Sequence, residues 1–263
     1  MQNHRFIFVC GLHRSGTSIL FKSLRDHPNL SGFHNTDSPE DEGMHLQSVY
    51  KPSGYYGGAG KFGFHPEAHL TESSPLVTEE NLQKLISEWS PYWDLSKQYL
   101  LEKSPPNLIR TRFLQAMFPD SYLIIMLRHP LAVSYATRKW YKKYRIYWRS
   151  LPRIFEHWLV CHEIFLQDRP YLKKAMILNY EQFVAEPSAY TNQIYEFLGM
   201  SPHPNNQTVL SDVNKKYFSI WKKDLNGFVS GIVARRMVRL FETRLNRFGY
   251  SLTDLEREDP ITE

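Results

Sequence analysis

Four short apolar segments constrain the fold more than any other feature of this 263-residue chain. They are rich in β-branched and aromatic residues and cover residues 5–11, 99–105, 120–128 and 174–183. Segments with helical spacing of apolar residues alternate with them, at 107–118, 132–144, 151–167 and 187–200. Strands that alternate with helices imply right-handed βαβ crossovers around a parallel sheet. We therefore expect one α/β domain over residues 1–263, with a central parallel β-sheet flanked by helices in three layers.

The first predicted strand runs into a glycine-containing loop, "GLHRSGTS", at residues 11–18. A helix with apolar spacing follows this loop, so the loop lies beyond the carboxyl end of a strand, where α/β sheets bind their ligands. Gly16 permits close backbone approach, and the N–H groups of Ser15 to Ser18 can surround an anion. The hydroxyls of Thr17 and Ser18 add donors. The loop predicts a phosphate or sulfate site, and a net charge of +5 favours an anionic ligand without requiring nucleic acid.

The loop lacks the lysine of a nucleotide-binding P-loop, G-x-x-x-x-G-K-[ST], because Thr17 stands in its place. Arg14 provides a cation three residues earlier. The apolar run at 123–127 leads into Arg128 and not into an aspartate that would hold magnesium. These two deficits disfavour a metal-assisted NTPase. A nucleotide-dependent kinase with a divergent loop remains the alternative function. The loop could also have no ligand and simply form a tight turn before a helix.

Four motifs, in order, resemble those of sulfotransferases that use 3′-phosphoadenosine 5′-phosphosulfate (PAPS). "GLHRSGTSIL" looks like the 5′-phosphosulfate loop of the R-S-G-T branch, which includes tyrosylprotein and bacterial enzymes. "LEKSPPN" resembles the lysine-proline element, "LIIMLRHPLAVSYA" is similar to the 3′-phosphate motif, and "ILNYEQFVAEP" to the Y-E-D-L segment. The resemblance implies a P-loop-like fold and metal-free transfer of a sulfuryl group to a hydroxyl, which leaves adenosine 3′,5′-bisphosphate.

The resemblance also implies which residues bind the donor. The 5′-phosphosulfate would be held by Arg14, Ser15, Gly16, Thr17 and Ser18. Arg128 would pair with the 3′-phosphate, for which its planar fork is suited. The family's serine falls eight residues later, where this chain has Ala136, so Ser134 or Thr137 is expected to replace it. Tyr180 would lie near the adenine, although a tyrosine at a strand end can also simply pack.

Sulfuryl transfer needs cations for the charge that grows on the bridging oxygen and a base for the acceptor proton. Arg14, the loop N–H groups and Lys103 can supply the positive charge. Lys103 follows an apolar strand, so we expect it to point across the same strand ends as the loop. By resemblance, it matches a lysine that the tyrosylprotein branch uses at the transition state.

The base is expected in "SPEDEGMHLQ", which brings Glu40, Asp41, Glu42 and His45 together. A partly buried carboxylate there can have its pKa raised toward neutrality. The resembled branch takes a glutamate from this part of the chain, which favours Glu42. His45 is the second candidate because the cytosolic branch uses histidine. His34, His65 and His69 are weaker ones, and clustered acids at a helix start can also serve only to compensate the helix dipole.

The region from about Phe33 to Trp93 has many glycines, tyrosines and prolines and little periodicity, which predicts a long mobile loop over the acceptor. Its aromatic side chains could stack on a sugar or aromatic acceptor, enclose a lipid-like one, or form a small hydrophobic cluster; they are Tyr50, Tyr55, Tyr56, Phe62, Phe64, Trp89 and Trp93. The acceptor therefore stays open among carbohydrates, lipids and small molecules. The tail at 228–252 predicts a packing helix with arginines on its solvated face.

The remaining features bound the class of protein. Cys10 and Cys161 are isolated, which predicts free core thiols. The apolar start of the chain ends too early for a signal-peptide core, and no apolar stretch is long enough to span a bilayer, so we expect a cytoplasmic protein. No cysteine and histidine spacing resembles a zinc site. A non-catalytic anion-binding module is a further alternative, and nucleic-acid binding is a poor one because the basic residues form no uninterrupted patch.

Overall fold

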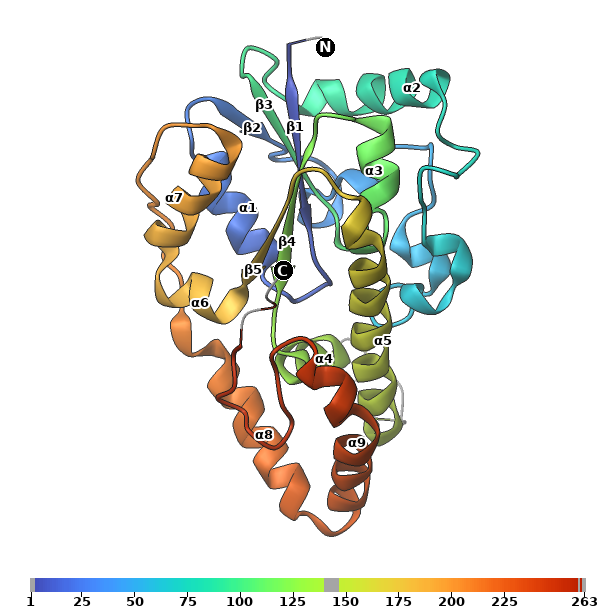
Figure 1. Ribbon diagram of the computed structural model, residues 1–263, viewed down its shortest axis with the longest axis vertical. Coiled ribbons are helices and arrows are strands. Elements are labelled where there is room, and N and C mark those ends of the chain that lie inside the picture. The colour runs from blue at the N-terminus through green and yellow to red at the C-terminus, as the bar shows by residue number, and fades with distance from the viewer. Residues whose placement is uncertain (1–2, 140–146, 260, 262–263) are drawn as a thin grey trace.

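A computed structural model describes residues 3–139, 147–259 and 261, and a parallel sheet forms its centre (Figure 1). The strands are β1 (Arg5–Cys10), β2 (Leu30–Gly32), β3 (Tyr99–Lys103), β4 (Tyr122–Leu127) and β5 (Ala175–Asn179). In the described part of the chain they form one five-stranded sheet in the order β2-β3-β1-β4-β5, and every neighbouring pair is parallel. The predicted parallel sheet is thus confirmed, and each of the four apolar segments contains one of its strands.

Helices cover the sheet on both sides. The helices of the described residues are α1 (Thr17–Arg25), α2 (Glu79–Trp89), α3 (Thr111–Met117), α4 (Pro130–Arg138), α5 (Tyr147–Asp168), α6 (Tyr180–Ala185), α7 (Pro187–Leu198), α8 (Lys215–Asn226) and α9 (Phe228–Asn246). In Figure 1, α1 and α7 lie on one side of the sheet, and α3 and α5 lie on the other. The central strands β1, β3 and β4 are almost wholly buried because both faces are covered. The expected three-layer α/β fold is confirmed.

Several helix boundaries differ from the sequence expectation. The strand expected over 174–183 ends at Asn179, and α6 begins at Tyr180. Pro105 and Pro106, just before the helix expected over 107–118, favour a short 3₁₀ turn, Pro105–Ile109. The helix α3 begins only at Thr111. The helix expected over 132–144 corresponds to α4, and residues 140–144 lie outside the described chain.

The region at 33–93 is not the continuous loop that its composition predicts. It contains short 3₁₀ turns and the helix α2, which begins where the Thr78 hydroxyl accepts a hydrogen bond from the N–H of Asn81 (3.2 Å). The aromatic rings of Phe33, Trp89 and Trp93 pack against one another, and the centroids of the stacked Phe33 and Trp93 rings lie 4.8 Å apart. The hydrophobic-cluster alternative is therefore the right one for the two tryptophans.

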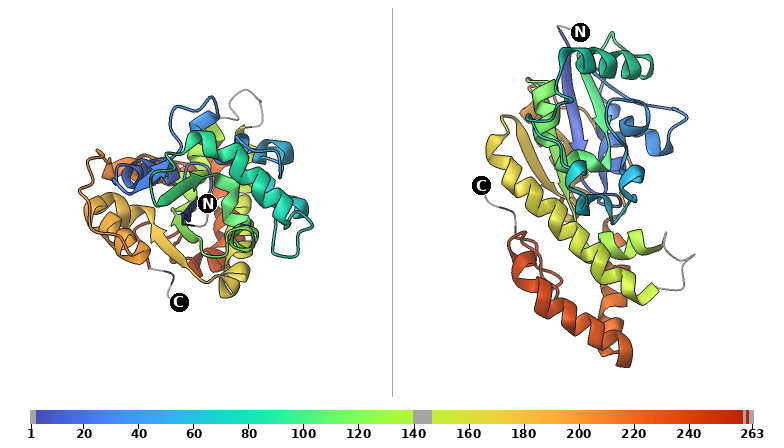
Figure 2. Two further views of the ribbon diagram at one scale, coloured as in Figure 1. Left: turned by 90° about the horizontal axis from the view of Figure 1, so that it is seen from above. Right: turned by 90° about the vertical axis from the view of Figure 1, so that its right-hand side faces the viewer.

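The last two helices form a hairpin that extends beyond the carboxyl end of the sheet (Figures 1 and 2). We call α8, α9 and the turn between them the basic hairpin. Its base packs against the domain: the buried indole of Trp221 donates to the Leu252 carbonyl (3.0 Å), and Phe241 stacks on Phe155 of α5 at 5.3 Å. No helix among the described residues is long and apolar enough to cross a membrane.

Candidate functional site

A cavity of about 650 Å³ opens at the carboxyl ends of the strands. It is lined by the loop after β1, by a segment after β2, by a glycine-rich turn and by the ends of β3 and β4. The lining residues are His13, Arg14, Gly16, Thr17, Ser18, Ile19, Pro39, Glu40, Glu42, Met44, His45, Ser53, Gly54, Gly58, Ala59, Pro105, Arg128 and Tyr180. Most of the residues predicted to bind the donor or to act in catalysis therefore meet in one place.

The loop at 11–18 presents the start of α1 to this cavity. Gly16 has φ = 100°, a left-handed conformation that favours glycine, and a Cβ there would lie 2.3 Å from the Tyr180 ring. The first helical hydrogen bond runs from the N–H of Leu20 to the Gly16 carbonyl (3.2 Å), so the N–H groups of Thr17 and Ser18 have no intrahelical acceptor. No acidic residue occupies the first turn of α1. The loop thus has the geometry of an anion site.

Ser15 does not present its N–H group to the cavity as expected. Its N–H donates to the Leu12 carbonyl (3.0 Å) because the turn closes at this point. Its side chain is fully buried below the loop, and its hydroxyl has no hydrogen-bond partner within the described structure. The ring of available backbone N–H groups therefore begins after Ser15.

Lys103, the last residue of β3, joins the loop to the acidic segment. Its buried ammonium group donates to Glu42 Oε1 (3.2 Å) and to the Glu40 carbonyl (2.9 Å), and it lies 3.5 Å from Ser18 Oγ. The structure thus brings together three side chains that the sequence places up to 85 positions apart. Ser18 also donates to the exposed Glu40 carboxylate (3.2 Å).

Glu42 is the buried acid of this segment. Burial raises the pKa of Glu42 above its ordinary value of 4.5, and the neighbouring Lys103 ammonium opposes that rise. His45 Nε2 lies 3.9 Å from Glu42 Oε2, and burial followed by the Lys103 charge lowers the pKa of His45. Both candidate bases therefore line the cavity, and Glu42 is the one in direct contact with Lys103.

A second buried carboxylate, that of Glu102, was not predicted from the sequence; it holds the backbone next to Glu42. Glu102 Oε1 accepts from the N–H of Gly43 (3.1 Å) and the Ser104 hydroxyl (2.5 Å), and its Oε2 accepts from the Asn107 amide (2.5 Å). Burial raises the pKa of Glu102 to about 7. A glutamate within an otherwise apolar strand was the available sign, because acids are rarely buried without hydrogen-bond partners.

Arg128 follows β4 and holds the loop from the other side. Its Nη1 donates to the Arg14 carbonyl (2.8 Å), and its Nε and Nη2 donate to Asn214 Oδ1 (3.0 and 2.7 Å). Its guanidinium lies 4.0 Å from the centroid of the Tyr180 ring. Each terminal nitrogen keeps one N–H without a partner among the described residues, and these two N–H groups are available to an anion.

A chain of hydrogen bonds behind Arg128 was also missed. The Asn214 amide donates to Glu181 Oε1 (2.6 Å), and the buried hydroxyl of Tyr250 donates to Glu181 Oε2 (2.8 Å). The backbone N–H of His129 shares Glu181 Oε1 (2.9 Å). The C-terminal part of the chain therefore orients the arginine at the cavity.

Other candidates lie away from the cavity. Ser134 and Thr137 are buried in α4 and are not among the described lining residues, so a role in place of Ala136 stays a prediction. His34, His65 and His69 do not line it either; His34 contacts Arg25 (3.0 Å), and His69 contacts Asp168 (2.8 Å).

Cys10 and Cys161 are free and buried, as predicted. No group of three or more His, Cys, Asp or Glu side chains in the described ranges is arranged to hold a metal ion.

Comparison with known proteins points to one family. The sequence profile of the sulfotransferase family matches residues 6–204. A sulfotransferase from Mycobacterium tuberculosis H37Rv superposes with a TM-score of 0.53 at 16% identity, covering 90% of this chain and 77% of that one. One from Mycobacterium avium gives a TM-score of 0.52 at 14% identity, covering 86% and 77%. At identities this low, the superpositions establish a shared fold and nothing further. No curated protein matches the chain in sequence.

Proposed function

The chain belongs to the sulfotransferase family, and from that premise we propose that it transfers a sulfuryl group from PAPS to a hydroxyl of its acceptor. One observation carries the proposal. The buried Lys103 bridges two residues that line the same cavity, the Glu42 carboxylate and Ser18 of the anion-binding loop. A candidate base and an anion site thus each lie within hydrogen-bond distance of the same cation, and transfer to a hydroxyl requires these three groups close together.

The residues at the cavity fit a nucleotide with anionic groups at both ends. Its volume of about 650 Å³ suits a ligand of nucleotide size. The N–H groups and hydroxyls of Thr17 and Ser18 suit the 5′-phosphosulfate, once Ser18 exchanges its contact with Glu40. The two remaining N–H donors of Arg128 suit the 3′-phosphate. The Tyr180 ring, packed between Gly16 and Arg128, offers a face for the adenine.

Each side chain has a distinct part in the proposed mechanism. The donor, when bound, supplies a sulfuryl group on a phosphate leaving group. Glu42 takes the proton of the acceptor hydroxyl, and its raised pKa makes it a better base near neutral pH. Lys103 and Arg14, with the N–H groups at the start of α1, stabilise the charge that develops on the leaving side. No metal takes part in the proposed transfer, and the cytoplasmic location remains an expectation.

The competing functions need features that the site does not favour. A kinase would aim a lysine at the terminal phosphates, whereas Thr17 lines the cavity at that position. A non-catalytic anion-binding module would gain nothing from the buried contact between Glu42 and Lys103, whose desolvation costs free energy.

The donor is tested by thermal unfolding. Adenosine 3′,5′-bisphosphate without magnesium is expected to stabilise the protein by about 2.7 kcal/mol at a hundred times its Kd. The Arg128→Ala variant should lose most of this effect, whereas Arg153→Ala, an exposed arginine away from the cavity, should keep it. Stabilisation only by ATP with magnesium would sink the proposal in favour of a kinase.

The base is tested by transfer assays with labelled PAPS over carbohydrate, lipid and small-molecule acceptors. With an acceptor in hand, Glu42→Gln should lower kcat by about 10²- to 10⁴-fold and leave stabilisation by adenosine 3′,5′-bisphosphate unchanged. The matched variant His45→Gln should keep most of the rate. The reverse pattern would move the base to His45, and an Arg14→Ala variant with normal transfer would refute the site assignment.

A further inference from the structure

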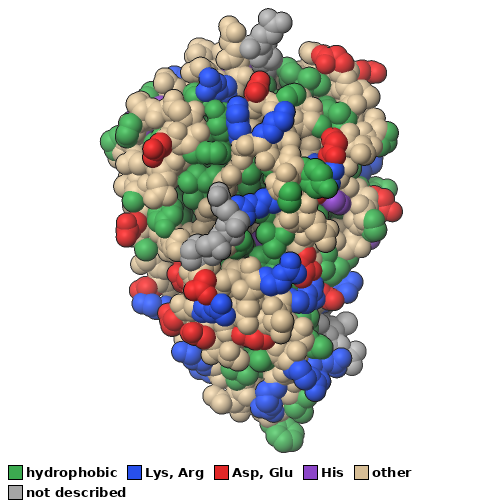
Figure 3. Space-filling view, in the orientation of Figure 1, with side chains coloured by type: hydrophobic (Ala, Val, Ile, Leu, Met, Phe, Trp, Pro, Cys, Tyr) green, Lys and Arg blue, Asp and Glu red, His purple; other side chains and the backbone are tan. Residues whose placement is uncertain are grey.

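The basic hairpin concentrates the positive charge of the molecule. Residues 215–246 contain eight lysines and arginines but only two acids, so their net charge of +6 exceeds the +5 of the whole chain. They also lie beyond residue 204, where the match to the sulfotransferase family ends. Figure 3 shows many Lys and Arg side chains around this lower end of the molecule. The positive charge is thus concentrated in a segment that follows the residues matched to the family.

The tip of the hairpin exposes large apolar side chains. Phe228, Val229 and Ile232 occupy the first turns of α9 and are 91%, 64% and 60% exposed. Leu240 is 50% exposed further along the same helix. Single exposed apolar residues are ordinary, but three within two helical turns at the end of a protrusion form a patch. Hydrophobic side chains indeed mark the lowest point of Figure 3.

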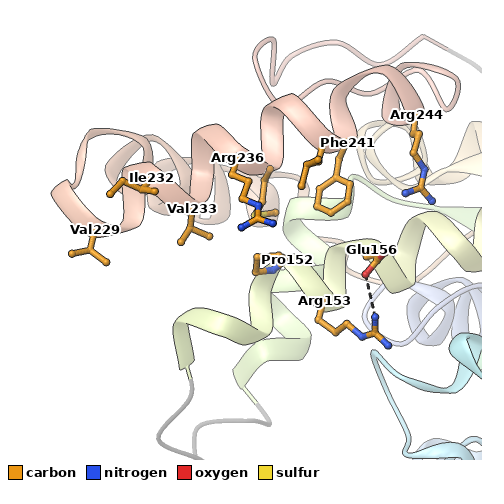
Figure 4. A pocket seen from close by; sticks show the side chains of 11 residues that line it. Pro152, Arg153, Glu156, Val229, Ile232, Val233, Arg236, Phe241 and Arg244 are labelled. Atoms are coloured by element: carbon orange, nitrogen blue, oxygen red, sulfur yellow. Dashed lines mark hydrogen bonds and ion pairs between the residues drawn. The ribbon is translucent and has the colours of Figure 1, made fainter.

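This patch continues into a groove between α9 and the start of α5. The groove has a volume of about 760 Å³, and Figure 4 shows Val229, Ile232 and Val233 on one wall, with Pro152 opposite. Its lining is mainly apolar, and Arg236 extends into the same view beside it. Apolar surface and positive charge are therefore interleaved on one face.

The arginines around the patch are not neutralised within the described chain. Arg244, at the far end of α9, pairs with Glu163 at 2.6 Å. By contrast, no ion pair among the described residues involves Arg235, Arg236 or Arg239. The first turn of α9 also contains no acid, although an acid there would stabilise the helix. The tip is thus apolar and positively charged at the same time.

We propose that the tip of the basic hairpin binds the surface of an anionic lipid bilayer. Phe228, Val229 and Ile232 would enter the boundary between headgroups and acyl chains, and the arginines and lysines behind them would contact lipid phosphates. A bilayer is the occupant that satisfies both features. Nucleic acid offers negative charge but no apolar layer for a valine and an isoleucine, and a second hairpin would be repelled by its like charge.

This attachment would be peripheral and independent of the donor chemistry. The hairpin extends beyond the carboxyl end of the sheet (Figure 1), and the cavity lined by Arg14, Ser18 and Arg128 opens at the same end. Binding through its tip would therefore hold the cavity on the membrane-facing half of the molecule. The inference rests on the hairpin alone and stands whichever acceptor the enzyme uses.

The test is co-sedimentation of the full chain with vesicles of phosphatidylcholine alone or with added phosphatidylglycerol. The wild type should bind only the anionic vesicles and should be released by salt. Replacing Arg235, Arg236 and Arg239 by glutamine should weaken binding on the order of fivefold per arginine. Replacing Phe228, Val229 and Ile232 by serine should weaken it on the order of tenfold per side chain.

Matched controls distinguish binding by this surface from nonspecific effects of positive charge or exposed hydrophobic side chains. Leu95→Ser removes an exposed leucine beside the start of β1, and K22Q/K84Q/K173Q removes three exposed cations outside the hairpin; both should bind as the wild type does. All variants should keep the wild-type Tm, since the altered residues are exposed.

Three results would overturn the proposal: no binding to anionic vesicles, full binding by the apolar triple variant, or tighter binding to an oligonucleotide. Concentration-dependent self-association that the apolar triple variant abolishes, without vesicle binding, would identify a second copy of the chain as the occupant instead.

Discussion

At the scale of single residues, the charged groups at the cavity depend on buried side chains that hold the surrounding segments in place. Arg14, Lys103 and Arg128 lie at or soon after the carboxyl ends of strands. These ends share one edge of a parallel sheet, so local patterns suffice to predict that the three residues meet. Glu102 escapes this reasoning because its role depends on contacts with Gly43, 59 positions away, and with the turn after β3. A Cβ on Gly43 would lie 2.5 Å from the Glu102 carboxylate, which shows how closely the two segments approach.

Glu102 should make stability depend on pH. Its pKa is about 7 in the folded protein against 4.5 for an ordinary glutamate, so the folded state holds the proton more tightly. Its contribution to the free energy of unfolding is full below pH 4.5 and is lost as pH rises to about 7, at about 1.4 kcal/mol per pH unit. Glu102→Gln cannot titrate and should remove this slope. Its new amide can donate to the Asn107 side-chain oxygen, which has no partner now, once that amide rotates.

Urea unfolding of the wild type and Glu102→Gln across this pH range checks the expectation. Other titrating groups cancel in the difference between the two proteins. Glu80→Gln, an exposed acid on α2, is the matched control and should retain the wild-type slope. A difference between wild type and Glu102→Gln that stays constant with pH would mean that Glu102 does not titrate in this window.

At the scale of elements, local pattern succeeds where an element is continuous and apolar. β1 and β4 are short runs of mostly buried apolar residues, the pattern typical of parallel strands covered on both faces. The pattern fails for α2, because the glycines and prolines before it suggest a loop although the helix has its own cap at Thr78. It also fails for α8, whose basic residues obscure the buried positions Phe218 and Trp221.

The 3₁₀ turn Ser211–Asn214, just before α8, should affect ligand binding at the cavity through the side chain of Asn214. Asn214 holds Arg128 across 86 positions of sequence. Asn214→Ala leaves Arg128 without two of its hydrogen bonds and leaves Glu181 without its amide donor. We expect a loss of stability of about 1–3 kcal/mol. We also expect about tenfold weaker binding of adenosine 3′,5′-bisphosphate, the factor that corresponds to 1.4 kcal/mol.

Calorimetric titration and thermal unfolding of the same samples measure both effects. Asn226→Ala, at the exposed end of α8, removes an asparagine that contacts only the Lys222 carbonyl of its own helix among the described residues, and it should change neither quantity. Unchanged nucleotide affinity in Asn214→Ala would show that Arg128 does not depend on this turn.

At the scale of the whole molecule, the boundary of the family match and the boundary of the folding unit differ. The match ends at residue 204, yet the core continues into the segment after it. The indole of Trp158 packs on Phe248 at 5.1 Å, and the His129 ring contacts the Ser251 carbonyl at 3.2 Å. A chain ended after residue 204 would expose these groups to water and would also lose the support of Arg128.

Such a truncated chain is therefore expected to unfold without a cooperative transition and to bind no adenosine 3′,5′-bisphosphate. Calorimetry of purified samples measures both. The apolar triple variant at the hairpin tip is the matched control, because its altered side chains are exposed, and it should unfold at the wild-type Tm. A truncated chain with the wild-type Tm would show that residues after 204 only decorate the domain. The contacts of Trp158 and Arg128 argue instead that the sulfotransferase core and the base of the basic hairpin fold as one unit, from which only the tip is free to meet a membrane.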